Sequence, residues 1–388
     1  MDIKKFLFID IGTEFLKTFI GEANENSINL INYKNFPSEG FRNGKISDFL
    51  NFKKSLQNIF NDDELSSFTE VVLCLGGFDI HSVNMDESII VKDVIDNKDF
   101  ESLFKNYLSK ITLTGYEPLM LYAPRVFIND IEIFHNPLGE VGGKLRAKGN
   151  LFVIKNEMYE NINEIKNMFL DKNIYTIPNC LISYEIFKKY EYIENTAIID
   201  IGAGTTNICL IKDNRLIAGY SLGVGSEYIT NDIMQTLELD FVEAENLKKY
   251  FSKIDNKIKG QGIVVDCSND ENNPKNVQYD FIYEIIDCRV NDIIELIKTT
   301  IEQQFKGFLN NIFLLGDGVL LYNFEEKLKV AFNLPMKCGN IKELPNISVN
   351  LDILGLKFRV RKEADNLEGK LNKEPKGLGA KFKSFFKM

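Results

Sequence analysis

Histidine and paired cysteines are scarce in this 388-residue sequence, and each shortage excludes a class of site. Only two histidines are present, His81 and His135, which are too few for a histidine-based metal centre or a catalytic triad. The six cysteines are scattered without a Cys-x-x-Cys pair. Buried free thiols in a reducing cytoplasm are therefore expected, rather than disulfides or a zinc site.

Long apolar runs and an excess of positive charge are also missing. No stretch approaches the roughly 20 apolar residues of a membrane-spanning helix. Residues 1–5 lead directly into a strand-like run, so we expect no secretory signal. The net charge of −10 argues against a broad basic surface, and no nucleic-acid partner is expected. With 44% hydrophobic residues, the chain can bury the cores of two or more domains.

Two similar Asp/Gly/Thr segments, residues 8–13 and 198–208, are the most informative feature that is present. Each consists of an apolar run, an aspartate, a turn rich in Gly and Thr, and further apolar residues, which predicts a strand, a tight turn and a second strand. Glycines allow backbone amides to close on an anion, and threonine hydroxyls add donors. The two copies predict two similar lobes that face one nucleotide.

Two weaker signals accompany these segments. Gly316-Asp317-Gly318 follows an apolar strand and precedes a predicted helix, which suits close approach to an adenosine. Glu245 and Lys248 lie one turn apart on another predicted helix and could reach a ribose and a base. Each signal alone is more often a plain turn or a solvated pair, and their order along the chain is what indicates a nucleotide site.

The residues predicted to bind ATP are Asp10, Gly12, Thr13, Lys17, Asp200, Gly202, Ala203, Gly204, Thr205, Thr206, Glu245, Lys248, Gly316, Asp317 and Gly318. Among them, Asp10 and Asp200 are expected to hold Mg²⁺ through water, because carboxylates at strand ends are suitable ligands for this ion. No residue that would orient an attacking water can be named from the sequence.

Helical and strand-like patterns alternate along the chain and predict an α/β protein. Helices are expected over residues 46–60 and 320–332, and a loop-rich excursion over residues 253–276. The expected parts are a first lobe (1–84 and 155–192), a small inserted α/β domain (85–154), a second lobe core (193–224 and 301–360), a subdomain that covers the adenine (225–300), a flexible linker (361–377) and an amphipathic helix (378–388).

The last segment reverses the charge of the chain. From residue 370 onward there are six lysines and one glutamate, a net charge of +5, and large apolar residues recur at helical spacing. A basic amphipathic helix after a linker favours binding to an anionic membrane surface. Docking on the protein's own core or on a partner is the alternative. The residues expected at the membrane are Leu378, Lys381, Phe382, Lys383, Phe385, Phe386 and Lys387.

The order of these motifs resembles the actin/Hsp70/sugar-kinase ATPase superfamily, and within it the FtsA family of actin-like bacterial cell-division proteins. Residues 9–13 with Gly21-Glu22 resemble the start of that family. Residues 136–139 and 143–148 are similar to the segment that closes its small domain, and residues 283–289 to a helix ahead of the adenosine motif. The resemblance implies a two-lobed actin-like fold with duplicated ribonuclease-H-like domains, a small inserted domain and a C-terminal amphipathic helix.

The resemblance also implies a function. It implies binding of ATP with Mg²⁺, self-association into protofilaments, and tethering of FtsZ filaments to the cytoplasmic face of the cell membrane at the division site. FtsZ is expected to contact residues 225–300. Asn207 stands where the second phosphate motif usually carries Asp, and Asp317 interrupts the usual Gly-Gly, so slow hydrolysis is expected.

Two alternatives belong to the same superfamily. A PilM-like adaptor of pilus assembly would not need the basic, Phe-rich tail. A small-molecule kinase would need a sugar or acid site between the lobes with an aspartate base, and no such motif stands out.

Overall fold

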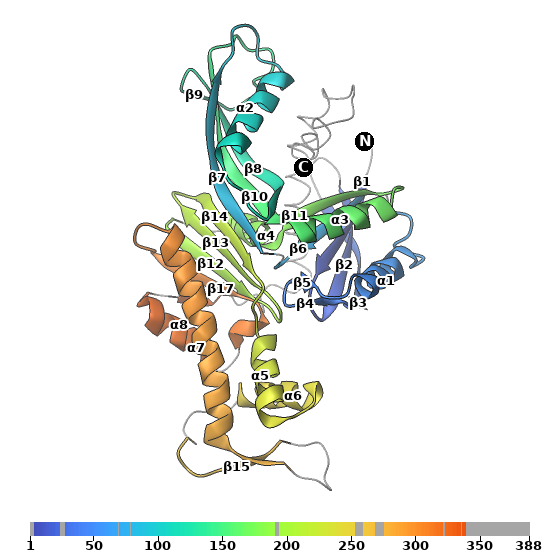
Figure 1. Ribbon diagram of the computed structural model, residues 1–388, viewed down its shortest axis with the longest axis vertical. Helices are drawn as coiled ribbons and strands as arrows, with labels where there is room; N and C mark the ends of the chain where they lie inside the picture. Colours follow the sequence, from blue (N-terminus) through green and yellow to red (C-terminus); the bar gives the residue numbers. More distant parts are fainter. Residues whose placement is uncertain are drawn as a thin grey trace.

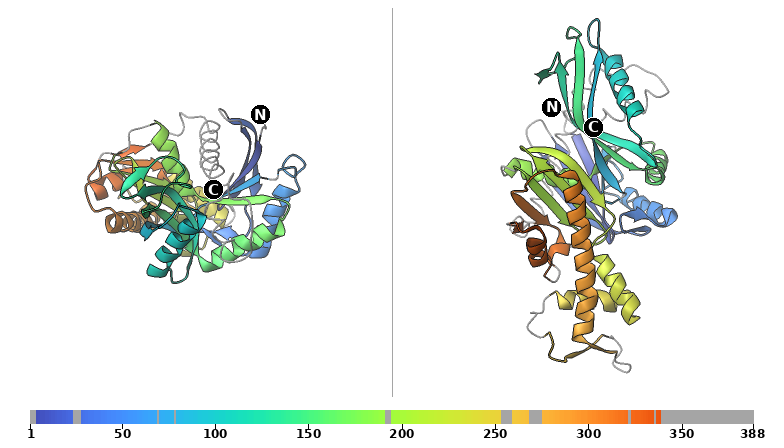
Figure 2. Two further views of the ribbon diagram at one scale, coloured as in Figure 1. Left: turned by 90° about the horizontal axis from the view of Figure 1, so that it is seen from above. Right: turned by 60° about the vertical axis from the view of Figure 1, so that its left-hand side comes forward.

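The computed structural model describes residues 4–23, 28–68, 70–77, 79–190, 194–252, 259–267, 275–320, 323–334 and 336–338. Two α/β lobes lie side by side at the centre of an elongated molecule (Figures 1 and 2). A smaller α/β unit projects at one end of the long axis, and a group of helices with a long central helix extends from the other.

The first lobe is built on a five-stranded sheet with the order β11-β6-β1-β2-β3. The first three strands along the chain form an antiparallel meander, and β6 and β11 add to β1 in parallel. The strands are β1 (Lys4–Ile11), β2 (Phe15–Ala23), β3 (Ile28–Pro37), β6 (Glu70–Leu75) and β11 (Asn173–Pro178). Helices α1 (Phe49–Phe60), α3 (Asn156–Met168) and α4 (Asn179–Tyr190) contribute side chains to the same core.

The second lobe repeats this arrangement with the order β18-β17-β12-β13-β14. Its meander is again antiparallel, and β17 and β18 again add in parallel. The strands are β12 (Thr196–Ile201), β13 (Thr206–Lys212), β14 (Arg215–Leu222), β17 (Asn311–Leu315) and β18 (Met336–Cys338). The predicted duplicated α/β fold is therefore confirmed.

The second sheet is buried on both faces. Along β12, Ala197, Ile199 and Ile201 join the core of the second lobe, whereas Ile198 between them joins the core shared with the first lobe. This alternation follows from the two-residue period of a strand. Helices α5 (Glu227–Leu237), α6 (Phe241–Phe251) and α7 (Tyr279–Gln304) pack in the former core, and α4 packs in the latter.

The inserted unit has a core of its own, which includes Met85, Phe104 and Leu145. It consists of β7 (Ile80–Ile90), α2 (Asn97–Lys110), β8 (Tyr116–Ile128), β9 (Ile131–Ile133) and β10 (Lys144–Lys155). Strand β7 begins beside β14 of the second lobe and continues into the insert, so a single nine-stranded sheet runs through both. The boundary predicted between residues 84 and 85 therefore falls inside β7.

The helix predicted over residues 46–60 begins later, at Phe49. The side chain of Asp48 accepts a hydrogen bond from the Asn51 amide and caps this helix. The preceding residues instead form a small hairpin of β4 (Phe41–Arg42) and β5 (Lys45–Ile46). The sequence did not reveal this hairpin, because each of its strands has only two residues.

Two differences concern the second lobe. The helix predicted over residues 320–332 is a short 3-10 turn, η2 (Asp317–Leu320), followed by α8 (Phe324–Phe332). Asn323, with a φ of 47°, precedes α8 in a left-handed conformation that a helix cannot continue. Within the loop-rich excursion, β15 (Val264–Asp266) and β16 (Asn276–Gln278) pair antiparallel.

Candidate functional site

The two Asp/Gly/Thr segments form the same strand–turn–strand structure in the two lobes. In the first, the Gly12 amide donates to the Phe15 carbonyl oxygen at 3.2 Å; in the second, the Gly202 amide donates to the Thr205 carbonyl oxygen at 2.8 Å. In each lobe the aspartate is the second-to-last residue of a buried strand, just before the turn. The predicted phosphate loops are thus two copies of one local structure.

The two loops meet across the gap between the lobes. A Cβ atom added to Gly204 would lie 2.0 Å from Oγ1 of Thr13, so only glycine allows this approach. The Gly316 turn lies against the second loop from the other side. A Cβ atom there would lie 2.6 Å from Oδ1 of Asp200, and the φ of Gly316 is +83°. The structure therefore gathers three of the predicted motifs into one place.

Four charged side chains interact where the two loops and the Gly316 turn meet. Burial, followed by the negative charge of Asp10, raises the pKa of Asp200 from 3.8 to about 6. Asp317 also contributes to this rise in the pKa, whereas a hydrogen bond from Asn207 and the charge of Lys17 oppose it. A carboxyl group with a raised pKa, facing a second carboxylate, indicates a position where a cation would relieve repulsion.

The donor set is compatible with a hydrated magnesium ion. Two carboxylates, Asp10 and Asp200, interact electrostatically here, and Mg²⁺ usually keeps several waters beside one or two carboxylates and substrate phosphates. Among the residues that the structure describes, no group of three His, Cys, Asp or Glu side chains could hold a metal ion by itself. The ion would therefore need phosphate oxygens and water as its remaining ligands.

Asn179 is a residue of this site that the sequence reasoning missed. It begins α4, directly after β11, and its Nδ2 donates to Oδ1 of Asp10 at 3.1 Å. Its own Oδ1 is buried and has no hydrogen-bond partner among the residues that the structure describes. A polar residue at the carboxyl end of a parallel strand was the available signal, since such ends line the ligand crevice of α/β sheets.

The hydroxyl and backbone groups of the second loop are partly committed within the lobe. Thr206 Oγ1 donates to the carbonyl oxygen of Val224 at 2.8 Å. The carbonyl oxygens of Gly202 and Ala203 accept from the amides of Ser226 and Glu227, at the start of α5. This leaves the loop anchored on α5, which fixes its position opposite Thr13.

The hairpin β4–β5 of the first lobe lies beside the same loop. The Arg42 guanidinium pairs with the Glu227 carboxylate at 2.5 Å, and the Glu227 side chain is only 6% exposed. A Cβ on Gly204 would also lie 3.2 Å from the Asn43 amide nitrogen. This hairpin is thus a second bridge between the lobes, which the sequence did not predict.

The predicted ribose and base contacts are engaged within the second lobe. Lys248 Nζ lies 2.6 Å from Glu245 Oε2 and donates to Thr230 Oγ1 at 2.9 Å, and Thr230 Oγ1 donates to Glu245 Oε2 at 2.7 Å. The Lys248 side chain is 6% exposed. These contacts tie α6 to α5, and the role of both residues toward a nucleotide stays a prediction.

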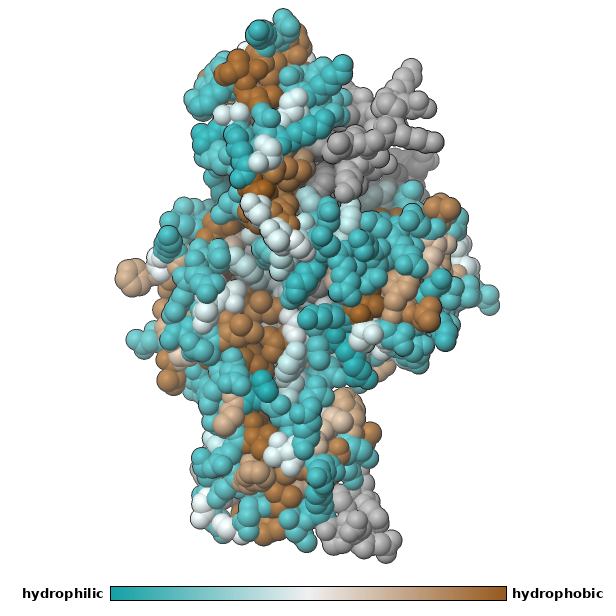
Figure 3. Space-filling view, viewed as in Figure 1, coloured by the Kyte–Doolittle hydropathy of each residue, from teal (hydrophilic) through white to brown (hydrophobic). Residues whose placement is uncertain are grey.

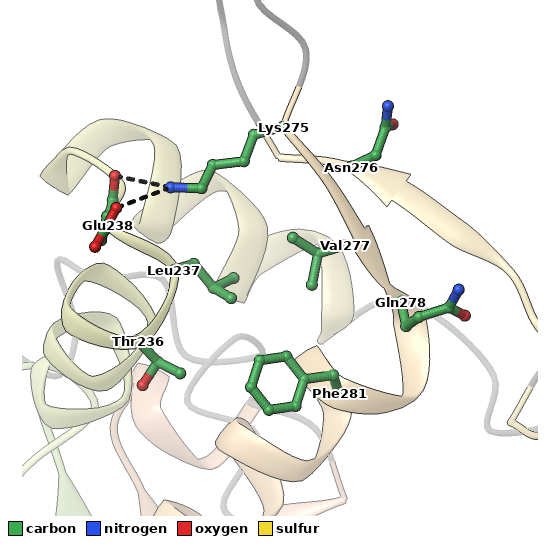
Figure 4. A pocket seen from close by; sticks show the side chains of 8 residues that line it. All are labelled: Thr236, Leu237, Glu238, Lys275, Asn276, Val277, Gln278 and Phe281. Atoms are coloured by element: carbon green, nitrogen blue, oxygen red, sulfur yellow. Dashed lines mark hydrogen bonds and ion pairs between the residues drawn. The ribbon is translucent and has the colours of Figure 1, made fainter.

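A pocket of about 360 Å³ lies far from these loops, near the free end of α7 (Figure 4). Leu237, Val277 and Phe281 give it an apolar floor, and Lys275 reaches across to Glu238. It falls within residues 225–300, the range predicted to contact FtsZ. The predicted linker and amphipathic helix, residues 361–388, lie outside the described residues.

Among the helices of the described part of the chain, none is long and apolar enough to cross a membrane.

Structural comparison defines the class of protein. The chain is similar to a PilM–PilN type IV pilus biogenesis complex, with a TM-score of 0.57 and 14% identity over 91% of this chain and 97% of the other. It is also similar to MreB5 of Spiroplasma citri bound to AMPPNP, with a TM-score of 0.52 and 14% identity over 95% and 99%. The fold is therefore that of the actin-like ATPases, as predicted.

Sequence comparison is more specific. The family model described as "Cell division protein FtsA" matches residues 197–352. The FtsA of Streptococcus pneumoniae is 23% identical over 86% of this chain and 74% of its own length. Curated proteins of the same name from other bacteria match at 20–24% identity. The chain is thus similar in sequence to FtsA cell-division proteins, which confirms the predicted resemblance.

Proposed function

We propose that this chain binds ATP with Mg²⁺ between its lobes, self-associates, and anchors FtsZ filaments to the cytoplasmic face of the cell membrane. The observation that carries the nucleotide proposal is the close approach of the two phosphate loops at Gly204 and Thr13, beside the interacting carboxylates of Asp10 and Asp200. The backbone turns would hold the phosphates, Lys17 would add positive charge, and the Gly316 turn would face the adenosine.

Hydrolysis would be slow under this proposal. At position 207 the chain carries an amide rather than a carboxylate, and this amide is already bonded to Asp200 and to the Ser221 hydroxyl. It therefore has no basic group to offer an attacking water. Nucleotide turnover would act as a switch for assembly.

An exposed apolar surface on the insert supports self-association. The free end of the insert carries exposed apolar side chains, and Figure 3 shows apolar surface there. The residues are Ile90, Val94, Ile131, Phe134 and Val141, and Phe134 is 89% exposed. Exposed apolar patches on soluble proteins mark interaction sites.

The C-terminal segment supplies the membrane part of the proposal. Four apolar side chains on one helical face, with lysines beside them, suit an anionic membrane surface. One short helix would bind reversibly, whereas a filament of many copies would bind firmly through effective concentration. Self-association and membrane binding would therefore reinforce each other, and FtsZ held by the 225–300 region would be brought to the surface.

The test is co-sedimentation of FtsZ with anionic liposomes and ATP. The full chain is compared with a form that ends at Pro375 and with a triple variant, F382S/F385S/F386S, which keeps every lysine. We expect the full chain to carry FtsZ into the liposome pellet and both altered forms to leave it in solution.

Unchanged liposome binding by the form ending at Pro375 would contradict membrane anchoring by the tail. Liposome binding without recruitment of FtsZ would contradict the partnership and favour an adaptor such as PilM. Transfer of phosphate from ATP to candidate sugars above background would favour a kinase.

A further inference from the structure

A chain of three hydrogen bonds runs from the first lobe to Asp200. The Gly77 amide, after β6 of the first lobe, donates to Ser221 Oγ on β14 at 2.5 Å. Ser221 Oγ donates to Asn207 Oδ1, and Asn207 Nδ2 donates to Asp200 Oδ2 at 3.4 Å. Ser221 and Asn207 are 1% and 4% exposed, so water cannot easily replace these partners.

The direction of the bonds is fixed by the chemistry of each group. A backbone amide can only donate, so Ser221 Oγ must accept from Gly77 and has its single proton left for Asn207. The Asn207 amide is then oriented with its oxygen toward Ser221 and its nitrogen toward Asp200. The orientation of a group beside the predicted cation ligand thus depends on a contact with the crossover that joins the first lobe to β7.

Asparagine is the residue type that this arrangement requires at position 207. Its amide accepts from a hydroxyl and donates to a carboxylate at the same time, which an ionised aspartate cannot do. Cross-strand pairing in the second lobe places Asn207 directly opposite Asp200. An aspartate there would add a further negative charge beside Asp200, whose ionised form is already disfavoured by the charges of Asp10 and Asp317.

We infer that Ser221 and Asn207 are positioning residues that couple closure of the two lobes to cation binding at Asp200. With the lobes closed, Gly77 holds the Ser221 hydroxyl, which holds the Asn207 amide, which keeps Asp200 in place. Gly77 lies in the crossover that leaves β6 of the first lobe and leads into β7, which pairs with β14 at Ser221. A movement of the first lobe that displaces this crossover would remove the donor of Ser221, and both side chains could then turn. The inference rests on the proposed binding of MgATP between the lobes.

The test compares the Mg²⁺ dependence of nucleotide binding in matched variants. Binding of a fluorescent ATP analogue to the full chain is titrated with Mg²⁺, and is also measured in EDTA. Ser221→Ala and Ser221→Cys remove the strong donor at nearly constant volume, and Ser221→Thr retains the hydroxyl. Arg42→Ala is the control, because it breaks another bridge between the lobes without touching Asp200 or its partners.

We expect Ser221→Ala and Ser221→Cys to raise the Mg²⁺ concentration for half-maximal binding about 3- to 10-fold, since one or two buried hydrogen bonds are lost. Nucleotide affinity in EDTA should be unchanged. Ser221→Thr should restore most of the wild-type Mg²⁺ dependence, and Arg42→Ala should stay within about two-fold of it. A purely structural role of Ser221 would instead lower affinity equally with and without Mg²⁺.

Three results would overturn the inference. In the first, Ser221→Ala and Ser221→Cys have the same Mg²⁺ dependence as the wild type. In the second, Arg42→Ala shifts the Mg²⁺ dependence as much as Ser221→Ala does. In the third, Ser221→Ala loses as much nucleotide affinity in EDTA as in Mg²⁺. In each of them the wild type still binds MgATP, so the proposed function stands. Absence of nucleotide binding by the wild-type chain would overturn both the inference and the nucleotide proposal.

Discussion

The two lobes share one architecture, but the side chains next to their aspartates differ. Strand pairing places Lys17 opposite Asp10 in the first lobe and Asn207 opposite Asp200 in the second. The first aspartate therefore has an exposed cation beside it, whereas the second has a buried amide. One repeated backbone thus carries a cation beside the first aspartate and a hydrogen-bonded amide beside the second, which we propose as the cation ligand.

The difference teaches that duplication fixes the backbone more strictly than the chemistry. Both turns close with the same Gly amide bond, and both lobes follow the same strand order. The cross-strand neighbour of each aspartate is free to differ, because it does not affect the turn. Substitutions at these paired positions are the direct way to break the comparison.

The largest effect is expected for Asp200→Asn. The substitution should abolish the rise in melting temperature that MgATP produces, because the second lobe loses its cation ligand. It should also stabilise the nucleotide-free protein by about 3 kcal/mol above pH 6, since an ionised Asp200 with a pKa near 6 is disfavoured in the folded state.

This gain depends on pH in a defined direction. Asp200 is charged in both the folded and unfolded states above pH 6, and neutral in both well below its unfolded pKa of 3.8. The stability difference between Asp200→Asn and the wild type should therefore be complete above pH 6 and shrink as the pH falls toward 4. Thermal melts across this range measure it, and a difference that grows on acidification would contradict the assignment.

Lys17→Asn makes the first lobe resemble the second. We expect it to weaken nucleotide binding about 10- to 100-fold, because a charge-assisted contact with phosphate is lost. The loss should be similar in Mg²⁺ and in EDTA, unlike the effect expected for Ser221→Ala. Equilibrium binding measured with Mg²⁺ and in EDTA distinguishes the contributions of the two lobes. A loss of nucleotide affinity in Lys17→Asn that appears only with Mg²⁺ would contradict the proposed roles.

Gly204→Ala tests whether the two loops touch. Its Cβ would overlap Oγ1 of Thr13, so the lobes must shift, at a cost of about 1–3 kcal/mol in unfolding free energy. Gly202→Ala is the matched control, because its Cβ would lie 3.4 Å from the nearest atom. Denaturant melts of Gly204→Ala with and without Thr13→Gly measure the coupling. Additive effects would indicate that the loops do not meet.

The smallest effect is expected at the hairpin bridge. Arg42→Ala leaves the buried Glu227 carboxylate without its ion pair, but Arg42 itself is 60% exposed, so about 1 kcal/mol of stability should be lost. Adding Glu227→Gln should recover part of it, because the uncompensated charge is removed. Chemical denaturation of the two variants measures this, and a double variant less stable than Arg42→Ala would contradict the pairing.

Sequence reasoning predicted the features that depend on local pattern. Apolar runs that end in Asp and Gly predicted both strand–turn–strand segments, and Glu245 and Lys248 lie on a helix, α6, as predicted. The hairpin of Arg42 and the position of Asn179 depend on contacts between segments that are distant in the sequence. No periodic pattern marks such residues, and Ser221 in particular is one polar residue within an ordinary strand.

The domain boundaries show the same limit. The change of character after residue 84 indicated the insert, but β7 runs without a break from the second lobe into it. Strand β7 joins the sheet of the second lobe because Ile80 pairs with Ser221 of β14. The sequence of β7 alone does not indicate this pairing. The interlobe bonds of Ser221 were hidden for the same reason.

Calorimetric titration of the full chain with nucleotide tests whether both lobes together bind one MgATP. We predict one nucleotide per chain, with binding strengthened by Mg²⁺ in the wild type and no Mg²⁺ effect in a folded Asp200→Asn variant. No binding by the wild type, or an unchanged Mg²⁺ effect in Asp200→Asn, would contradict the account.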